Sequence, residues 1–183
     1  MQPVSQLGQI LEEVSSDEHF IYSKSDLRNM IPSITDYNLN MILSRCISKK
    51  ILIRVCKGIY FFCRKETNKS IVLYKTAAKL RCEYMNYISL ETVLCEHSII
   101  SQQMPSFLTV MTSGRSGLID CGQFGTIEFV HTAKDFSRIS ANLFIDTKAK
   151  MLKATPVQAY RDMVDTRRTT LALIDESAKK ELI

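Results

Sequence analysis

Apolar residues recur at helical spacing three times within the first 48 positions. The first set predicts a short amphipathic helix and comprises Leu7, Ile10, Leu11 and Val14. A second helix is predicted over residues 25–31, with Ser25 as N-cap and Pro32 as its stop. The third follows Thr35 or Asp36 as cap, with apolar residues at i, i+3, i+4, i+7 and i+8: Leu39, Ile42, Leu43, Cys46 and Ile47. The chain is therefore expected to open with three helices.

The pattern then changes to two β-rich runs around a glycine. Residues 51–65 are ILIRVCKGIYFFCRK, which predicts a β-hairpin that turns at Cys-Lys-Gly. Strand alternation places Tyr60 and Phe62 on one face and Ile59 and Phe61 on the other, so at least one face should pack on the helices. Three helices followed by a hairpin predict a winged helix-turn-helix domain over residues 1–66.

The polar stretch TNKS, residues 67–70, is the expected domain boundary, and residues 70–183 mix helical and β-like patterns. One helix is predicted over residues 71–84 and another after Ser89 as cap. The runs FLTVMTS, GLIDC and TIEFVHT, separated by SGRSG and GQFG, predict an antiparallel meander. Further strands are expected at NLFI and KMLKA, followed by a helix that begins at Pro156 and a short helical tail. The predicted fold class is α+β.

Charge is concentrated where the third helix and the hairpin lie. The net charge is +5, and residues 31–65 carry seven basic residues against one acid. Asparagine pairs with adenine and arginine with guanine, so the solvent side of the third helix could contact bases through Thr35, Tyr37, Asn38, Asn40, Ser44 and Arg45. Phosphates could be held by Lys49, Lys50, Arg54, Lys57 and the Tyr60 hydroxyl. The alternative is a solvated basic face on a protein that binds no DNA.

No pattern in the chain indicates catalysis. Cys95 and His97 are two residues apart and would point to different faces of a helix, and neither GxSxG nor HExxH occurs. The six cysteines lack zinc-site spacing, so neither a metal nor a cofactor is expected, and free thiols suit a reducing compartment. The acidic N-terminal stretch is unlike a signal peptide and no long apolar run follows, so a cytoplasmic protein without membrane partners is expected.

Three stretches, taken in order, resemble AbiEi-type antitoxins. KGIYFF after a basic strand resembles the wing of that family, and YISLETVLCEHSII is similar to its helix after the domain junction. KATPVQAYRDMV resembles an Ala-Thr-Pro helix start, a pattern that falls here on Ala154, Thr155, Pro156, Ala159 and Asp162. Val157 and Gln158 replace the acidic and basic residues usual at those positions.

The resemblance implies a bacterial, cytoplasmic antitoxin of a type IV toxin-antitoxin system with a role in phage defence. Its winged helix would bind inverted repeats in double-stranded operator DNA and repress its own operon. Its C-terminal domain would counter a nucleotidyltransferase-like toxin encoded alongside, without the need for a stable complex. The chain is expected to be a monomer or weak dimer.

The candidate toxin-facing residues lie at the exposed basic end of the predicted helix PVQAYRDMVDTRR and are Arg161, Arg167 and Arg168. A solvated helix face explains these arginines equally well. Two other functions stay open: a protein-interaction module that binds no DNA, and a transcriptional regulator whose C-terminal domain senses a small ligand.

Overall fold

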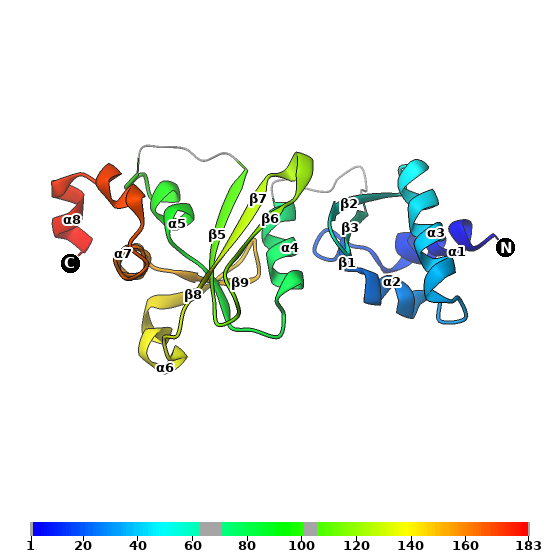
Figure 1. The fold of residues 1–183 in the computed structure, drawn as a ribbon, viewed down its shortest axis with the longest axis horizontal. Helices are drawn as coiled ribbons and strands as arrows, with labels where there is room; N and C mark the ends of the chain where they lie inside the picture. Colours follow the sequence, from blue (N-terminus) through cyan, green and yellow to red (C-terminus); the bar gives the residue numbers. More distant parts are fainter. Residues whose placement is uncertain (1, 63–70, 101–105, 183) are drawn as a thin grey trace. The chain divides into compact units, whose positions relative to one another are not determined.

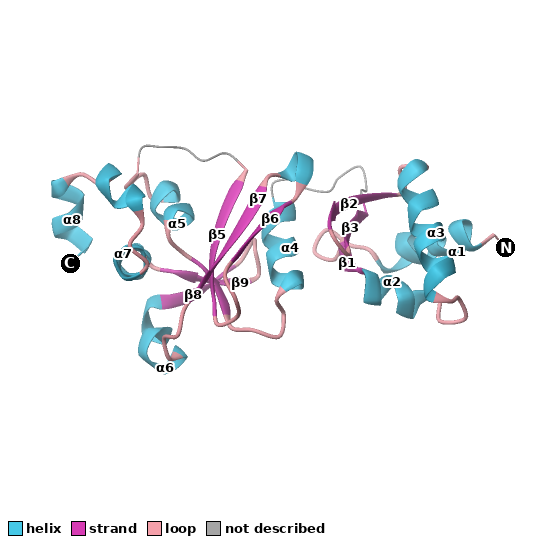
Figure 2. Ribbon diagram, viewed as in Figure 1, coloured by secondary structure: helices cyan, strands magenta, loops and turns pink. Residues whose placement is uncertain are grey.

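The computed structural model describes residues 2–62, 71–100 and 106–182 (Figure 1). It divides into two compact units: an N-terminal unit of Met1–Leu80 with Gly122–Phe124, and a C-terminal unit of Arg81–Cys121 with Gly125–Ile183. Each unit combines helices with a β-sheet, so the predicted α+β class is confirmed (Figure 2). The expected boundary at residues 67–70 and the end of the basic segment, residues 63–65, lie outside the described residues.

The N-terminal unit packs helices against a small antiparallel sheet. Its helices are α1 (Pro3–Val14), α2 (Lys24–Met30), α3 (Asp36–Ser48) and α4 (Val72–Leu80). Its strands are β1 (Ile21–Ser23), β2 (Leu52–Cys56) and β3 (Ile59–Phe62), in the order β1-β3-β2. The hairpin β2–β3 turns at Lys57 and Gly58, as predicted, and Gly58 has a φ of 79° that a glycine adopts without steric cost. Strand β1 was not predicted.

The caps of α2 and α3 follow local hydrogen-bonding rules. The Ser23 hydroxyl accepts from the Asp26 amide (3.1 Å) while the Asp26 carboxylate accepts from the Ser23 amide (2.7 Å), which is a capping box. The predicted cap at Ser25 is therefore wrong, and the helix begins at Lys24. In α3, the prediction of Thr35 as cap is confirmed, because its hydroxyl accepts from the Asn38 amide (3.4 Å).

The N-terminal sheet buries side chains on both faces. Tyr60 and Phe62 belong to the same core cluster as the buried residues of α1, α2 and α3. Phe61 points the other way, and its ring makes edge contacts with Phe20 (5.7 Å between centroids) and Phe124 (5.6 Å). All four residues of β3 are buried, so both faces of the strand pack, which agrees with the prediction that at least one would.

The C-terminal unit contains a six-stranded mixed sheet in the order β6-β7-β5-β4-β9-β8. The strands are β4 (Asn86–Ile88), β5 (Phe107–Thr112), β6 (Gly117–Asp120), β7 (Thr126–His131), β8 (Leu143–Asp146) and β9 (Met151–Ala154). Parallel pairs join β5 to β7 and β4 to β9, so the predicted antiparallel meander is wrong. Strand β7 buries Ile127 and Phe129 in the interior of the sheet, whereas β6 takes an edge and leaves Leu118 exposed.

Four α-helices and three short 3-10 helices complete the described part of the chain, and all but one of them lie in the C-terminal unit. They are α5 (Glu91–Glu96), α6 (Phe136–Ile139), α7 (Pro156–Asp165), α8 (Glu176–Leu182), η2 (Gly122–Phe124, grouped with the N-terminal unit), η3 (Ser140–Asn142) and η4 (Thr169–Leu173). The prediction that Pro156 starts a helix is confirmed, and Thr155 caps that helix by accepting from the Gln158 amide (3.3 Å). None of the helices described is long and apolar enough to cross a membrane.

The segment before α5 departs from the predicted cap. Leu90 stands at the N-cap position with φ 58° and ψ −138°, a conformation that costs a non-glycine residue about 1–3 kcal/mol. The hydroxyl of Ser89, the predicted cap, instead donates to the Asp162 carboxylate (2.6 Å). The cap prediction at Ser89 is therefore wrong, because a partner distant in sequence takes its hydroxyl.

Candidate nucleic-acid interface

Helix α3 separates a buried apolar face from an exposed face that is largely polar. Its buried residues are Leu39, Ile42, Leu43 and Cys46. All six residues proposed for base contact are exposed: Thr35, Tyr37, Asn38, Asn40, Ser44 and Arg45. Ile47, which the apolar pattern assigned to the core, is 37% exposed instead. The described structure thus leaves the whole outward face of α3 open to solvent.

The centre of that face includes two residues that sequence reasoning missed, Met41 and Ser48. At 100° per residue, the outward centre line runs through Tyr37, Met41, Ser44 and Ser48 at i, i+4, i+7 and i+11. Asn40 and Arg45 flank it on opposite sides. Tyr37 is 75% exposed and Met41 is 42% exposed. The signal that could have found Met41 is its spacing of four residues from Tyr37.

One acid stands at the start of the α3 face. Asp36 is the first residue of the helix and would repel a phosphate nearby. The Arg28 guanidinium of α2 donates to its carboxylate at 2.9 Å, which offsets that negative charge. Thr35 uses its hydroxyl oxygen to cap the helix, so it holds the N-terminal turn in place as well as lying at its surface.

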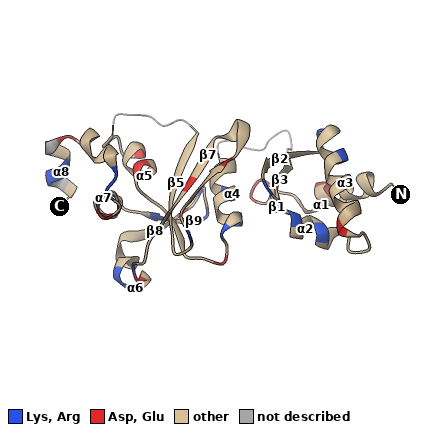
Figure 3. Ribbon diagram, in the orientation of Figure 1, with Lys and Arg blue, Asp and Glu red and all other residues tan. Residues whose placement is uncertain are grey.

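Exposed basic side chains continue from the end of α3 into the hairpin. Lys49, Lys50, Arg54 and Lys57 are all exposed, and Figure 3 shows basic positions on α2 and at the C-terminal end of α3. Among the described residues, Lys49, Lys50 and Lys57 take part in no ion pair. Arg54 bonds locally, with Nε donating to the Cys56 carbonyl at 3.3 Å. These charges are therefore available to an anionic partner.

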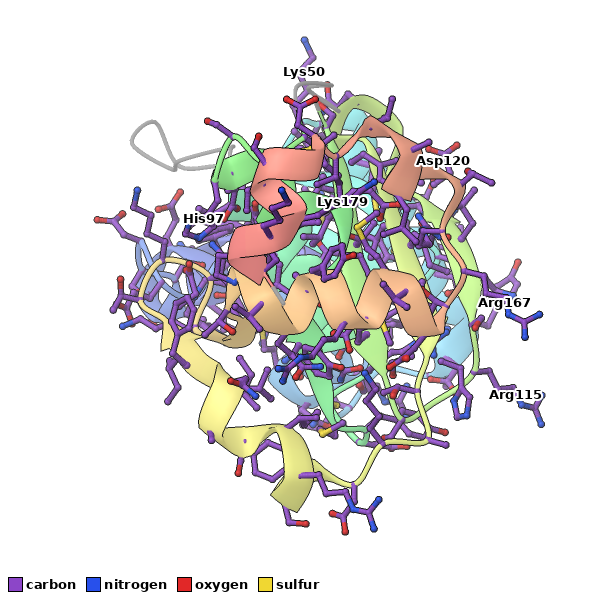
Figure 4. The ribbon with its side chains drawn as sticks, turned by 90° about the vertical axis from the view of Figure 1, so that its left-hand side faces the viewer. Lys50, His97, Arg115, Asp120, Arg167 and Lys179 are labelled. Carbon is purple, nitrogen blue, oxygen red and sulfur yellow. The ribbon has the colours of Figure 1, made fainter. Side chains whose placement is uncertain are left out.

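Lys50 occupies a position where glycine is usual. It follows the last turn of α3 with φ 59°, a left-handed conformation that costs a non-glycine residue about 1 kcal/mol or more. In Figure 4 its side chain extends away from the ribbon. The chain therefore has a cation at this position although its backbone conformation is strained.

Tyr60 lies in a different environment from the other predicted contact residues. It is 8% exposed and belongs to the core cluster of the N-terminal unit. Burial raises the pKa of its hydroxyl, an effect that the charge of Arg54 opposes. Arg54 lies directly opposite Tyr60 in the β2–β3 ladder. The Tyr60 ring therefore contributes packing beneath the exposed arginine.

The three arginines proposed as a toxin-facing surface fall into two groups. Arg161 and Arg167 are exposed, and Figure 4 shows Arg167 extending away from the ribbon. Arg168 instead pairs with Glu91 (2.6 Å) and bidentately with Glu128 (2.8 and 2.7 Å). The bonds to Glu128 and then to Glu91 raise the pKa of Arg168, whereas burial opposes the shift. The expectation of an exposed Arg168 is wrong, because this residue cross-links α5, β7 and the segment after α7.

The stretches YISLETVLCEHSII and KATPVQAYRDMV, which are distant in sequence, meet at a buried carboxylate. Asp162 is fully buried and accepts from Ser89 (2.6 Å), Gln158 (2.8 Å) and Lys134 (2.7 Å). Lys134 also pairs with Asp165 at 2.6 Å. Burial alone would lower the pKa of Lys134, but its bonds to the two aspartates raise it above the usual value. Sequence reasoning missed Lys134, since no local pattern links it to α7.

A cleft of about 1250 Å³ lies beside this network. Its lining mixes cations and acids, including Lys134, Arg138, Arg161, Asp135 and Asp165. The balance of charges favours neither an anionic nor a cationic ligand, although the volume is ample for a small molecule. No sequence pattern predicted this cleft.

In comparisons with known proteins, the chain matches no protein-family model and no curated protein at a significant level. The exposed face of α3 carries groups that can contact base edges, and the lysines after it carry charge that can contact phosphates.

Proposed function

We propose that the chain is a bacterial antitoxin that binds operator DNA and represses its own operon. The observation that carries the DNA-binding half is the exposed polar face of α3, continued by exposed lysines at its end and at the hairpin turn. The succession of α2, a short turn, α3 and a β-hairpin supports a winged helix-turn-helix. The antitoxin half, directed against a nucleotidyltransferase-like toxin, is supported by the resemblance of three short motifs.

In the proposed complex, α3 lies in the major groove. Asn38, Asn40 and Arg45 contact base edges, because their amides and guanidinium match adenine and guanine. The basic residues Lys49, Lys50, Arg54 and Lys57 hold phosphates and fix the register of the helix on the duplex. With about six phosphates engaged, affinity falls by about three orders of magnitude between roughly 50 and 200 mM salt.

Charge reversal at two lysines tests the DNA-binding half. The double variant Lys50→Glu and Lys57→Glu should abolish a mobility shift of the duplex upstream of its own reading frame at about 100 mM salt, since it replaces two phosphate contacts with repulsion. The matched control is Lys148→Glu with Lys150→Glu, also exposed; Lys150 shares the left-handed conformation of Lys50. Unchanged binding by a folded Lys50/Lys57 variant would overturn the proposed DNA contact.

Growth rescue tests the antitoxin half. A nucleotidyltransferase encoded next to this chain should arrest growth when expressed alone, and co-expression of the full chain should restore it. The Lys50/Lys57 double variant should rescue equally well, because both substitutions lie in the N-terminal unit. If the double variant fails to rescue growth, neutralisation of the toxin requires DNA binding. If the unaltered chain fails to rescue growth, the antitoxin role is refuted.

The cleft favours a second candidate function, a regulator whose C-terminal unit binds a small ligand. That function predicts DNA affinity that changes when a metabolite mixture is added and returns after dialysis. A protein-interaction module predicts the opposite pattern, with a stable protein complex and no salt-dependent affinity for DNA.

A further inference from the structure

Two large apolar side chains lie on the outward face of α3. Tyr37 is 75% exposed and Met41 is 42% exposed, one helical turn apart. Asn40 and Ser44, both exposed, lie beside them on the same face. An isolated exposed apolar residue needs no explanation, but these two adjoin on the face proposed to enter the major groove.

Within the described residues, neither side chain is part of the packed core. Neither belongs to the buried cluster of the N-terminal unit or packs against it as a partly buried member. Within the described residues, the side chain of Tyr37 makes no hydrogen bond and no ring contact. A polar residue at either position would solvate better, so both are expected to contact something apolar outside the chain.

The major groove offers one prominent apolar group on its base edges. Thymine presents its C5-methyl group there, whereas the other bases present hydrogen-bond donors and acceptors. A tyrosine ring supplies a flat apolar surface, and a methionine adapts its flexible side chain to an irregular one. Asn40, adjacent on the same face, can pair bidentately with adenine.

We infer that Tyr37 and Met41 select A·T pairs by contact with thymine methyl groups, beside an adenine contact from Asn40. This inference rests on the proposed function, because it requires α3 to lie in the major groove. It makes the two apolar residues specificity determinants and assigns to each half-site at least one thymine whose methyl group contributes to affinity.

Replacement of thymine by deoxyuracil isolates the methyl group, because it keeps every hydrogen-bonding atom. Duplexes are first selected by the full chain from a random-sequence library, and each thymine is then replaced singly. Loss of one buried methyl contact should weaken binding by about fourfold at one or two positions of each half-site. Titrations by fluorescence anisotropy at constant salt measure the change.

The variants Tyr37→Ala and Met41→Ala complete the test as double-mutant cycles. Each should bind thymine and deoxyuracil duplexes equally at the position that its side chain contacts, while its dependence on salt stays unchanged. Leu118→Ala, an exposed apolar residue of the C-terminal unit, should keep the full fourfold discrimination. Circular dichroism of each variant establishes that it is folded.

Three results are possible. A fourfold loss that disappears in the Tyr37 or Met41 variant supports the inference. Salt-dependent binding with no sensitivity to deoxyuracil at any position, or with a loss that persists in both variants, overturns it and leaves the proposed DNA binding intact. Failure of the library to yield any duplex bound in a salt-dependent manner refutes the proposed function, and the inference with it.

Discussion

The two units of this chain differ in the surroundings of several of their charged side chains. In the N-terminal unit, Lys49, Lys50 and Lys57 are exposed and join no ion pair among the described residues. In the C-terminal unit, the fully buried Asp162 and the nearly buried Glu91 are tied to basic side chains by short hydrogen bonds. Some basic residues of the N-terminal unit therefore face solvent unpaired, whereas some of the C-terminal unit neutralise buried carboxylates.

This difference separates effects on binding from effects on stability. An exposed, unpaired cation contributes little to folding, so its replacement should alter association with an anion and leave the fold intact. A buried paired charge behaves differently, because removal of one partner leaves the other desolvated and unsatisfied. Substitutions in the two units should therefore have separable consequences.

The largest expected effect is on stability, at Arg168. Its replacement by asparagine leaves Glu91 and Glu128 without their cation, which should lower the free energy of unfolding by about 3 kcal/mol. The neighbouring Arg167→Asn is the matched control and should change stability little, because Arg167 is exposed and asparagine tolerates its φ of 54°. Urea denaturation measures both. Equal stability of the two variants would mean that the buried cross-link contributes nothing to folding.

Lys50→Gly should change the free energy of unfolding by a smaller amount than Arg168→Asn, and in the stabilising direction. Glycine relieves the left-handed backbone at φ 59° and should stabilise the fold by about 1 kcal/mol, while it removes one cation from the proposed interface. The salt dependence of DNA binding should then decrease by about one counterion. Lys150→Gly, at φ 55° in the C-terminal unit, relieves the same kind of backbone strain and should leave DNA affinity unchanged. A lower free energy of unfolding for Lys50→Gly than for the unaltered chain would contradict the conclusion that the backbone of Lys50 is strained.

The smallest expected effect concerns pH and Asp26 in the N-terminal unit. Burial raises the pKa of Asp26, but bonds from Lys79 and from Ser23 outweigh burial and hold it below the usual 3.8. Because the folded pKa is lower than the unfolded one, the stabilisation is present above about pH 4 and is lost as pH falls through the folded pKa. Asp26 is partly exposed, so the contribution should stay below about 1 kcal/mol.

Thermal unfolding of Asp26→Asn tests this linkage. The variant should be less stable than the unaltered chain near neutral pH, and the difference should narrow below about pH 4 as Asp26 becomes protonated. Lys79→Met removes the cationic partner of Asp26, so stability should depend less on pH in this variant than in the unaltered chain. A difference between Asp26→Asn and the unaltered chain that stays constant at all pH values would exclude Asp26 as a titrating contributor.

Local patterns predicted the N-terminal unit better than the C-terminal sheet. The helix of Leu39, Ile42 and Leu43 and the hairpin at Gly58 depend on neighbours a few residues away, and both were predicted. Strand β1 escaped prediction because its three residues are too few to show alternation. In the C-terminal unit, the parallel ladders join segments distant in sequence, so the turn-rich pattern gave the wrong pairing.

Side-chain roles in the C-terminal unit were hidden for the same reason. Ser89 satisfies the local rule for a helix cap, yet its partner Asp162 lies 73 positions away. Arg168 looked like a solvated cation, because neither Glu91 nor Glu128 is near it in sequence. Exposure of the α3 face, by contrast, follows from the helical period alone. Long-range charge pairing was thus the main property that the sequence could not reveal.

The place of β4 between β5 and β9 sets an order of events during synthesis. Strand β9 leaves the ribosome after β5, β6, β7 and β8, so one edge of β4 has no partner until most of the chain has been made. The three strands of the N-terminal sheet, in contrast, are complete once Phe62 has been added. Folding should accordingly begin in the N-terminal unit, while the open β4 edge keeps the nascent C-terminal unit exposed to aggregation and to chaperones.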